Sequence, residues 1–213
     1  MRTKSILLGA AILAAGVASS MASNVYSVNV VGYVNVSITN GFTMIANPLD
    51  FDGTGTNNSL NTVLSNAAPD FTSVYKFSGG TFGGASFSVS GQWFPNQSLN
   101  PGEGCFINNT SGNPFNVTFV GTVITNSSLA IAPGFSIVAS KMPITGGVGT
   151  VLQLTNMTDF DTIYTWNTPG QTYNGASFSV SGAWFPEPTI TPGQSFFVNA
   201  ANSKNWVQAF SVQ

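Results

Sequence analysis

The chain has 213 residues, of which 43% are apolar and only 6% are charged, whereas about 25% of the residues in an average soluble domain are charged. The apolar fraction is large enough for a packed core, which excludes a disordered chain. The polar surface must come from uncharged residues that favour turns and strands over helices. Histidine is absent, so catalysis by a Ser-His-Asp or Cys-His arrangement is excluded.

The N-terminus has the pattern of a secretory signal peptide. Arg2 and Lys4 precede an apolar run at residues 6–18, which is shorter than the roughly 20 residues needed to span a bilayer. The small residue Ala22 ends a favourable cleavage sequence. We therefore expect a cleaved signal peptide (1–22) and a secreted protein that is extracellular, periplasmic or at the cell surface. An uncleaved membrane anchor is the alternative.

The charge that remains after cleavage limits the partners. The chain then retains three lysines and seven acidic residues, which gives a net charge of −4. Such a chain cannot neutralise a row of phosphates, so nucleic acids and anionic membranes are poor partners. No second long apolar run follows, and we expect the mature chain not to be an integral membrane protein.

The first part of the mature chain predicts strands and a helix. Residues 24–38 alternate β-branched or aromatic residues with polar ones, and a second strand is predicted at 41–48, with its copy at 134–140. Residues 57–67 place leucine and valine at helical spacing after an Asn/Ser start, and 146–156 has a weaker version of this pattern. These two segments predict one short helix in each half of the chain.

Further strands are predicted at residues 70–77 and at their copy, 159–166, where aliphatic and aromatic residues alternate. Each half closes with one more strand, at 115–124 and 206–212. The first of these closing strands resembles the start of the mature chain, so it is a candidate to open the second half as well. Residues 125–133 would then be a short linker.

The most informative stretch is residues 84–106, because it occurs again at 175–197. The first eight residues of both copies are GASFSVSG, and Trp-Phe-Pro follows in both after one variable position. A match of this length indicates a tandem duplication. Ala85, Phe87 and Val89 alternate with serines, which predicts a strand with its apolar side chains in the core and its serines in solvent.

Each copy continues through a turn into another strand. Pro101-Gly102 and Pro192-Gly193 predict tight turns, because proline fixes φ and glycine accepts a positive φ. Cys105 is the only cysteine, so no internal disulfide can form. Its counterpart in the second copy is Phe196, which favours a buried apolar role for Cys105 over pairing with another chain.

These patterns predict an all-β protein of two tandem homologous domains, residues 23–125 with the N-terminal strand and residues 126–213. Each domain is expected to be a β-sandwich or barrel-like, with five or six strands and one short helix. A membrane β-barrel is the runner-up architecture. It is disfavoured because several strands are shorter than the roughly 9–11 residues that a membrane-spanning strand needs.

Three spaced motifs resemble a β-module that recurs in secreted bacterial and archaeal surface proteins, of the type Gly-aromatic-x-aliphatic-Ile-x-x-Pro followed by Pro-Gly-x-Gly-aromatic. They are Gly41-Phe42-x-Met44-Ile45-x-x-Pro48, Val74-Tyr75 and Pro101-Gly102-x-Gly104-x-Phe106-Ile107. Residues 25–33 are similar to the start of secreted bacterial proteins with such modules. The resemblance covers most of the mature chain and implies a β-fold and a surface location, with no activity attached. The second half departs from it at Lys141-Met142-Pro143 and at Ser195.

The carboxylates suggest two further hypotheses. Asp50 and Asp52 precede Gly53 in the manner of a calcium loop, but the additional acids of such loops are missing, so a polar turn is favoured. Asp70 and Asp159 hold matching positions, and a glycosidase-like pair would have to span the two domains. Turn or capping roles are favoured for both, and we expect no catalytic residue, no metal site and no cofactor.

The repeated Trp-Phe-Pro motifs are the candidate ligand-binding site. Trp93 and Phe94, like Trp184 and Phe185, are neighbours on a predicted strand, so their rings face opposite ways. One ring can fill the core while the other is exposed, and an exposed ring near Asn, Gln and Ser can bind the apolar face of a sugar. The alternative is that both rings pack, one in the core and one against the neighbouring domain.

The sequence therefore favours a non-catalytic extracellular or cell-surface β-module protein with a structural or adhesive role. The alternative is a carbohydrate-binding protein that uses the Trp-Phe-Pro motifs. The expected partners are a cell-surface glycan or another surface protein.

Overall fold

The computed structural model describes residues 30–64 and 68–211, which form an all-β protein built of antiparallel sheets. One short helix, α2 (Leu60–Val63), is the exception within these ranges. The predicted all-β class is therefore confirmed. In the described part of the chain no helix is long and apolar enough to cross a bilayer. The expected signal peptide (1–22) and the start of the predicted first strand (24–29) lie outside the described residues.

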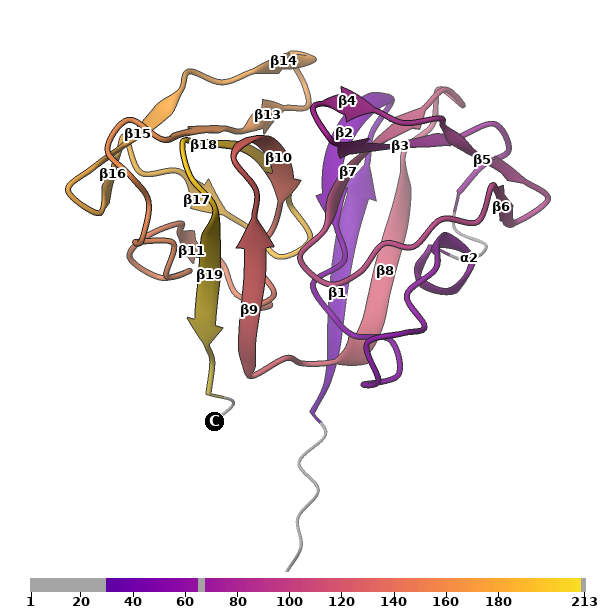
Figure 1. Ribbon diagram of the computed structural model, residues 1–213. Coiled ribbons are helices and arrows are strands. Elements are labelled where there is room, and N and C mark those ends of the chain that lie inside the picture. The colour runs from indigo at the N-terminus through magenta and orange to yellow at the C-terminus, as the bar shows by residue number, and fades with distance from the viewer. Residues whose placement is uncertain (1–29, 65–67, 212–213) are drawn as a thin grey trace, which may run out of the picture.

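The first half of the chain contains a six-stranded antiparallel sheet, on the right in Figure 1. Its strands lie in the spatial order β2 (Gly41–Ala46), β7 (Gly104–Asn109), β3 (Ser73–Ser78), β5 (Ser86–Val89) and β6 (Gln92–Phe94), and the short β4 (Thr81–Phe82) pairs with β3. The predicted turn before β7 is present, because Gly102 adopts a positive φ of 87°.

The second half repeats this strand order. Its sheet consists of β10 (Gly134–Val138), β18 (Phe196–Ala200), β12 (Thr162–Tyr164), β15 (Ser177–Val180) and β16 (Ala183–Phe185). A small hairpin of β13 (Trp166–Asn167) and β14 (Thr172–Tyr173) takes the place of the β3–β4 hairpin. The order of the strands is thus the same in both halves, while the division into two domains at residue 125 stays a prediction about independent folding.

The helix predicted at residues 146–156 is wrong. This segment instead forms turns and the short strand β11 (Gly146–Gly147), which pairs with β17 (Thr189–Ile190). The physical reason is its three glycines, at Gly146, Gly147 and Gly149, because glycine costs about 1 kcal/mol per residue in a helix relative to alanine.

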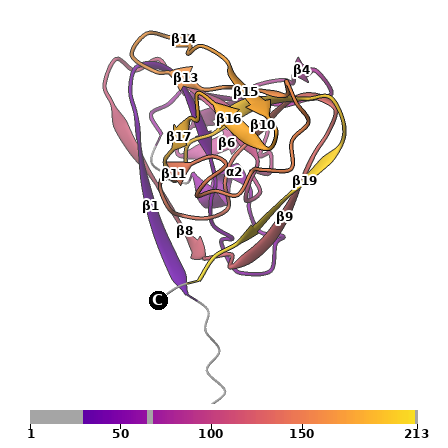
Figure 2. The same cartoon turned by 90° about the vertical axis from the view of Figure 1, so that its left-hand side faces the viewer.

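Two long ribbons extend away from the sheets. β1 (Val31–Ile38) pairs with β8 (Phe115–Thr122), and β9 (Asn126–Ile131) pairs with β19 (Lys204–Ala209). Figure 2 shows the ribbons as the two sides of a V, which converge where β8 leads into β9. The linker predicted at 125–133 therefore contains a strand. The closing strand of the first half does not open the second half, because its partner is β1.

Each half has its own apolar core. Trp93, Phe119 and Leu60 belong to the first core, and Trp184 and Trp206 belong to the second. A third apolar cluster lies between the halves and takes two side chains from each. Its buried members are Met44, Phe106, Ile137 and Phe197.

Backbone hydrogen bonds join the two halves in a two-fold pattern. Ala46 N donates to Gly193 O at 2.9 Å, and the equivalent Ala139 N donates to Gly102 O at 3.0 Å. Isolated bridges repeat the same symmetry, Ile45 with Gln194 and Val138 with Glu103. Equivalent surfaces of the two halves therefore face each other, as in an isologous dimer interface.

The predicted orientation of the repeated GASFSVSG strand is wrong. Ser86 and Ser88 are buried, while Phe87 and Val89 are exposed. The reason lies in the pairing of β5 with β6, since Ser88 lies opposite Trp93, and directly opposed residues share a face of the sheet. The large indole fills the core, and the small serines leave room for it.

Cys105 is fully buried in the first core, as predicted from its counterpart Phe196. Burial raises the pKa of the Cys105 thiol to about 12.

We expect Cys105 in the folded protein to resist alkylation by iodoacetamide at pH 8, because only the thiolate reacts and burial disfavours it. The same thiol should react readily in concentrated guanidinium chloride. Mass spectrometry of the two samples measures the modified fraction. Equal rapid labelling in both would contradict a buried Cys105.

Candidate functional site

The structure places the members of each Trp-Phe-Pro motif in different environments. Trp93 and Trp184 are 1% and 4% exposed, whereas Phe94 and Phe185 are 59% and 58% exposed. The indole nitrogens donate inside the cores, Trp184 Nε1 to the carbonyl oxygen of Leu154 at 2.7 Å. The tryptophans therefore offer no ring face to a ligand, and only the two phenylalanines are accessible.

The exposed phenylalanines belong to two apolar patches, which we call the outer patches. Each patch contains four side chains at equivalent positions. The first is Phe71, Phe87, Val89 and Phe94, and the second is Phe160, Phe178, Val180 and Phe185. Three members of each patch lie on the β5–β6 or the β15–β16 hairpin, at opposite ends of the molecule (Figure 1). Phe71 and Phe160 lie in adjacent turns, and their backbone N–H groups donate to Ser88 O and Ser179 O of the hairpins.

Asp70 and Asp159 hold the turns of these outer hairpins. Asp70 Oδ1 accepts a hydrogen bond from Ser90 N at 2.7 Å, and Asp159 Oδ1 accepts one from Ser181 N at 2.6 Å. These contacts fit the capping role that the sequence favours. The two hairpins lie at opposite ends of the molecule (Figure 1), whereas a glycosidase pair needs both carboxylates in one cleft.

The Asp50–Gly55 loop is held by its own hydrogen bonds. Asp50 accepts from Asn58 Nδ2 and from Gly55 N, and Asp52 accepts from the backbone and the hydroxyl of Thr54. Among the described residues, no group of three or more acidic or cysteine side chains is placed to hold a metal ion. The polar turn favoured by the sequence describes this loop.

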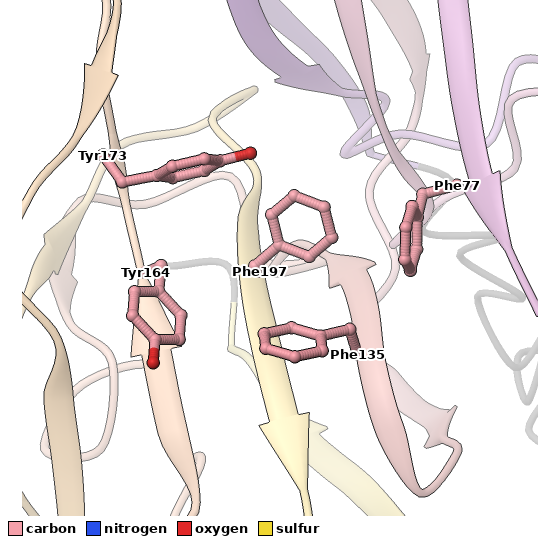
Figure 3. Close-up of a pocket in the computed structure, with 5 residues that line it drawn as sticks. All are labelled: Phe77, Phe135, Tyr164, Tyr173 and Phe197. Carbon is pink, nitrogen blue, oxygen red and sulfur yellow. The ribbon is translucent and has the colours of Figure 1, made fainter. Parts of the chain in front are cut away.

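Aromatic side chains gather where the two sheets meet and form a cleft of about 340 Å³, which we call the first cleft. It is lined by Phe77, Phe135, Tyr164, Tyr173 and Phe197. Figure 3 shows Phe77 of the first half facing the other four rings, which all come from the second half. The ring centroids of Phe77 and Phe197 are 5.0 Å apart in an edge-to-face arrangement, which is favourable for aromatic pairs.

A second cleft of about 470 Å³ lies next to the first and shares Tyr173 with it. It is lined by Phe42, Tyr75, Phe82, Phe106, Trp166 and Tyr173. With the exception of the shared Tyr173, each of these side chains occupies the position equivalent to one in the first cleft. The two clefts therefore follow the two-fold relation between the halves. We refer to them together as the paired clefts.

Alternation along the strands explains why these rings share one face. Val74 points into the first core, so its neighbour Tyr75 points to the opposite face of β3, as does Phe77. Phe106 on β7 lies opposite Tyr75 in the sheet register. The face away from each half's core is thus aromatic, and the association of the halves buries only part of it.

Gln171 fixes the β13–β14 hairpin of the second half against β2 of the first. Its side-chain amide accepts from Phe42 N at 2.7 Å and donates to Phe42 O at 2.9 Å. Trp166 Nε1 also donates to Phe42 O at 2.9 Å. These three bonds hold Trp166 and Phe42 in the wall of the second cleft.

Each aromatic cleft shares lining residues with a more polar hollow. The hollow next to the first cleft shares Phe77 and Phe135 with it and includes Ser78 and Ser136. The hollow next to the second cleft shares Trp166 and is the more polar of the two. Its polar lining residues are Asn35, Ser37, Thr43, Thr168, Thr191 and Gln194.

Thr43 has an unusual place among the residues that line this hollow. Its side chain is buried, and its hydroxyl oxygen has no hydrogen-bond partner among the described residues. This hydroxyl has almost no accessible surface, and Thr43 lies opposite Ile107 of the first core in the sheet register, so its side chain points to that core and not into the hollow.

The paired clefts are uncharged. Among the described residues that line them, none is acidic or basic. Burial raises the pKa of Tyr173 above its usual range, so its phenol stays neutral at physiological pH. The site therefore offers aromatic faces and neutral hydroxyl groups.

Sequence patterns alone do not identify these residues as a site. A signal is nevertheless present, because Phe42, Tyr75 and Phe106 are the aromatic positions of the three spaced motifs. Their convergence with rings from the other half depends on how the two sheets associate, which no local pattern specifies.

No protein-family model, curated protein sequence or solved structure matches the chain. The candidate site therefore rests on the geometry and chemistry of its own residues.

Proposed function

We propose that this protein is a non-catalytic extracellular or cell-surface β-module protein with an adhesive role, and that it attaches to its target through the paired clefts. The observation that carries the proposal is the exposed aromatic surface where the two sheets meet. Phe42, Phe82, Phe135 and Tyr173 each remain between 37% and 48% exposed there.

Exposed apolar surface is unfavourable in water, and a binding role would explain why the protein keeps it. Contiguous apolar surface is rare on soluble monomers and commonly marks a site of interaction. The concave shape and the ring-lined walls of the clefts are typical of ligand sites, which usually fall between about 300 and 1,000 Å³. The expected signal peptide supports a location outside the cytoplasm.

The experiment that tests this proposal measures attachment of the mature chain (23–213) to cell envelopes isolated from the producing organism. We expect the protein to sediment with the envelopes and the double variant Phe82→Ser/Phe135→Ser to stay in solution. Both replaced side chains are half-exposed cleft residues, so folding should be preserved. Circular dichroism checks this.

The outer patches supply the matched control and the second candidate function. Phe94 and Phe185 are the accessible part of the Trp-Phe-Pro motifs, and carbohydrate binding there remains the alternative. Loss of attachment in Phe94→Ser/Phe185→Ser, with normal attachment of the cleft variant, would support that alternative. Absence of attachment by the unaltered chain, or release of reducing sugars or peptides at enzyme-like rates, would overturn the proposed function.

A further inference from the structure

We infer that the paired clefts bind a neutral polysaccharide, with sugar rings packed on the aromatic side chains of both clefts at once. This inference rests on the proposed function and specifies the chemical class of its ligand.

The aromatic walls suit the apolar faces of sugar rings. Phe135, Tyr164 and Tyr173 present rings to the first cleft from one side, and Phe77 closes it from the other (Figure 3). Packing of a C–H-rich sugar face on such rings removes apolar surface from water. Tyr164 and Tyr173 also bring hydroxyl groups that can donate to or accept from a sugar.

The polar hollows distinguish a sugar from an acyl chain. An acyl chain would fill the aromatic clefts but would bring no hydrogen-bonding group to Asn35, Ser37 and Gln194 in the adjoining hollow. A sugar carries hydroxyl groups around its ring edge, and these can both donate and accept. The exposed side chains of Asn35 and Ser37 in the hollow are accessible partners for such groups.

A proline-rich peptide is the competing macromolecule. Aromatic grooves bind such peptides as polyproline II helices, whose backbone carbonyls need hydrogen-bond donors. The indole N–H of Trp166 already donates to Phe42 O, so the tyrosine hydroxyls are the remaining donors among the lining side chains. Peptide carbonyls only accept, whereas sugar hydroxyls can both donate to and accept from these phenols. The structure therefore favours the sugar.

The uncharged lining and the two-fold relation between the clefts further restrict the chemical class of the ligand. The described lining of both clefts is uncharged, so an anionic polysaccharide would lose hydration without gaining an ion pair. The clefts are lined by aromatic residues at equivalent positions of the two halves and share Tyr173. A polymer of repeating sugars can occupy both, and the second contact then strengthens binding without loss of translational freedom.

Isothermal titration calorimetry on the mature chain tests this inference with cello-, xylo-, manno- and malto-oligosaccharides, from disaccharides to octasaccharides. We expect at least one neutral series to bind, and its longest members to bind at least about tenfold more tightly than the disaccharide. Affinity should be nearly independent of NaCl concentration, because no charges are involved.

Three variants assign the binding to the clefts. Phe135→Ala in the first cleft and Phe82→Ala in the second should each weaken the octasaccharide about tenfold or more, while leaving short sugars a second, intact cleft. Phe94→Ser/Phe185→Ser should bind normally.

The outcomes separate this inference from the proposed function. If the clefts are needed for envelope attachment but no neutral oligosaccharide binds, the glycan inference fails and the adhesive proposal stands. Cleft-dependent binding of decaproline, or of polygalacturonate in a salt-dependent manner, would also overturn it. Neutral-sugar binding that is unaffected by the cleft variants would show that the sugar site lies elsewhere.

Discussion

Replacing Trp184 by alanine should lower the free energy of unfolding by about 3–5 kcal/mol, as for other buried aromatic residues. The indole is almost fully buried in the second core, and its Nε1 donates to Leu154 O. The substitution removes the packing of the ring, opens a cavity and leaves a buried carbonyl without its donor. Urea denaturation followed by circular dichroism measures the change.

The adjacent residue provides the matched control. Phe185→Ala alters a ring of similar size in the same short strand, β16, but this ring is mainly exposed. Its effect should stay within about 0.5 kcal/mol, as for surface substitutions in general. Equal losses in the two variants would contradict the inward orientation of Trp184 and the outward orientation of Phe185.

Gly104→Val should destabilise the protein by about 1–3 kcal/mol, the usual range for an overpacked interior. A Cβ atom at Gly104 would lie 2.5 Å from Ser195 Cβ and would also collide with Ile137, both of which belong to the other half. The two sheets would have to separate to relieve these contacts. Urea denaturation measures the loss, and binding to the paired clefts should fall with it.

Gly84→Val is the matched control for Gly104→Val. A Cβ atom added at Gly84 would meet nothing within 4 Å, and Gly84 does not adopt a positive φ, so Gly84→Val should have little effect. If Gly104→Val were equally harmless, the close contact between the halves would be contradicted.

The close contact between Gly104 and Ser195 explains why the second copy has serine where the first copy has glycine. Gly104 and Ser195 occupy equivalent positions, and the two-fold relation brings them together. Where equivalent residues meet, the space holds one small side chain and not two. The side chain of Ser195 fills this space, and Gly104, which has no side chain, leaves it free. The departure at Ser195 therefore follows from packing near the two-fold axis.

Several features could be predicted from local pattern. Alternation of apolar and polar residues indicates strands wherever it occurs, and the Pro-Gly pairs indicate turns because of their φ preferences. The burial of Cys105 followed from Phe196 at the equivalent position. Each of these depends on neighbours in sequence or on the internal repeat.

The orientation of the repeated strand could not be predicted in the same way. An alternating strand has two faces, and one residue of shift exchanges them. Alternation alone assigns the apolar face to the core, yet the pairing of Ser88 with Trp93 reverses that assignment. The largest ring determines the inward face, and the sequence pattern of β5 alone does not contain that information.

Composition and alternation act within short segments, and they are enough to indicate a sparsely charged, strand-rich chain with a repeated β-unit. Long-range packing determines that β9 pairs with β19, that the rings of Trp93 and Trp184 are buried and that aromatic residues far apart in the chain form the paired clefts. The physical reason is that two equivalent sheet faces associate across a two-fold relation. That association depends on the fit of whole surfaces and not on any local motif.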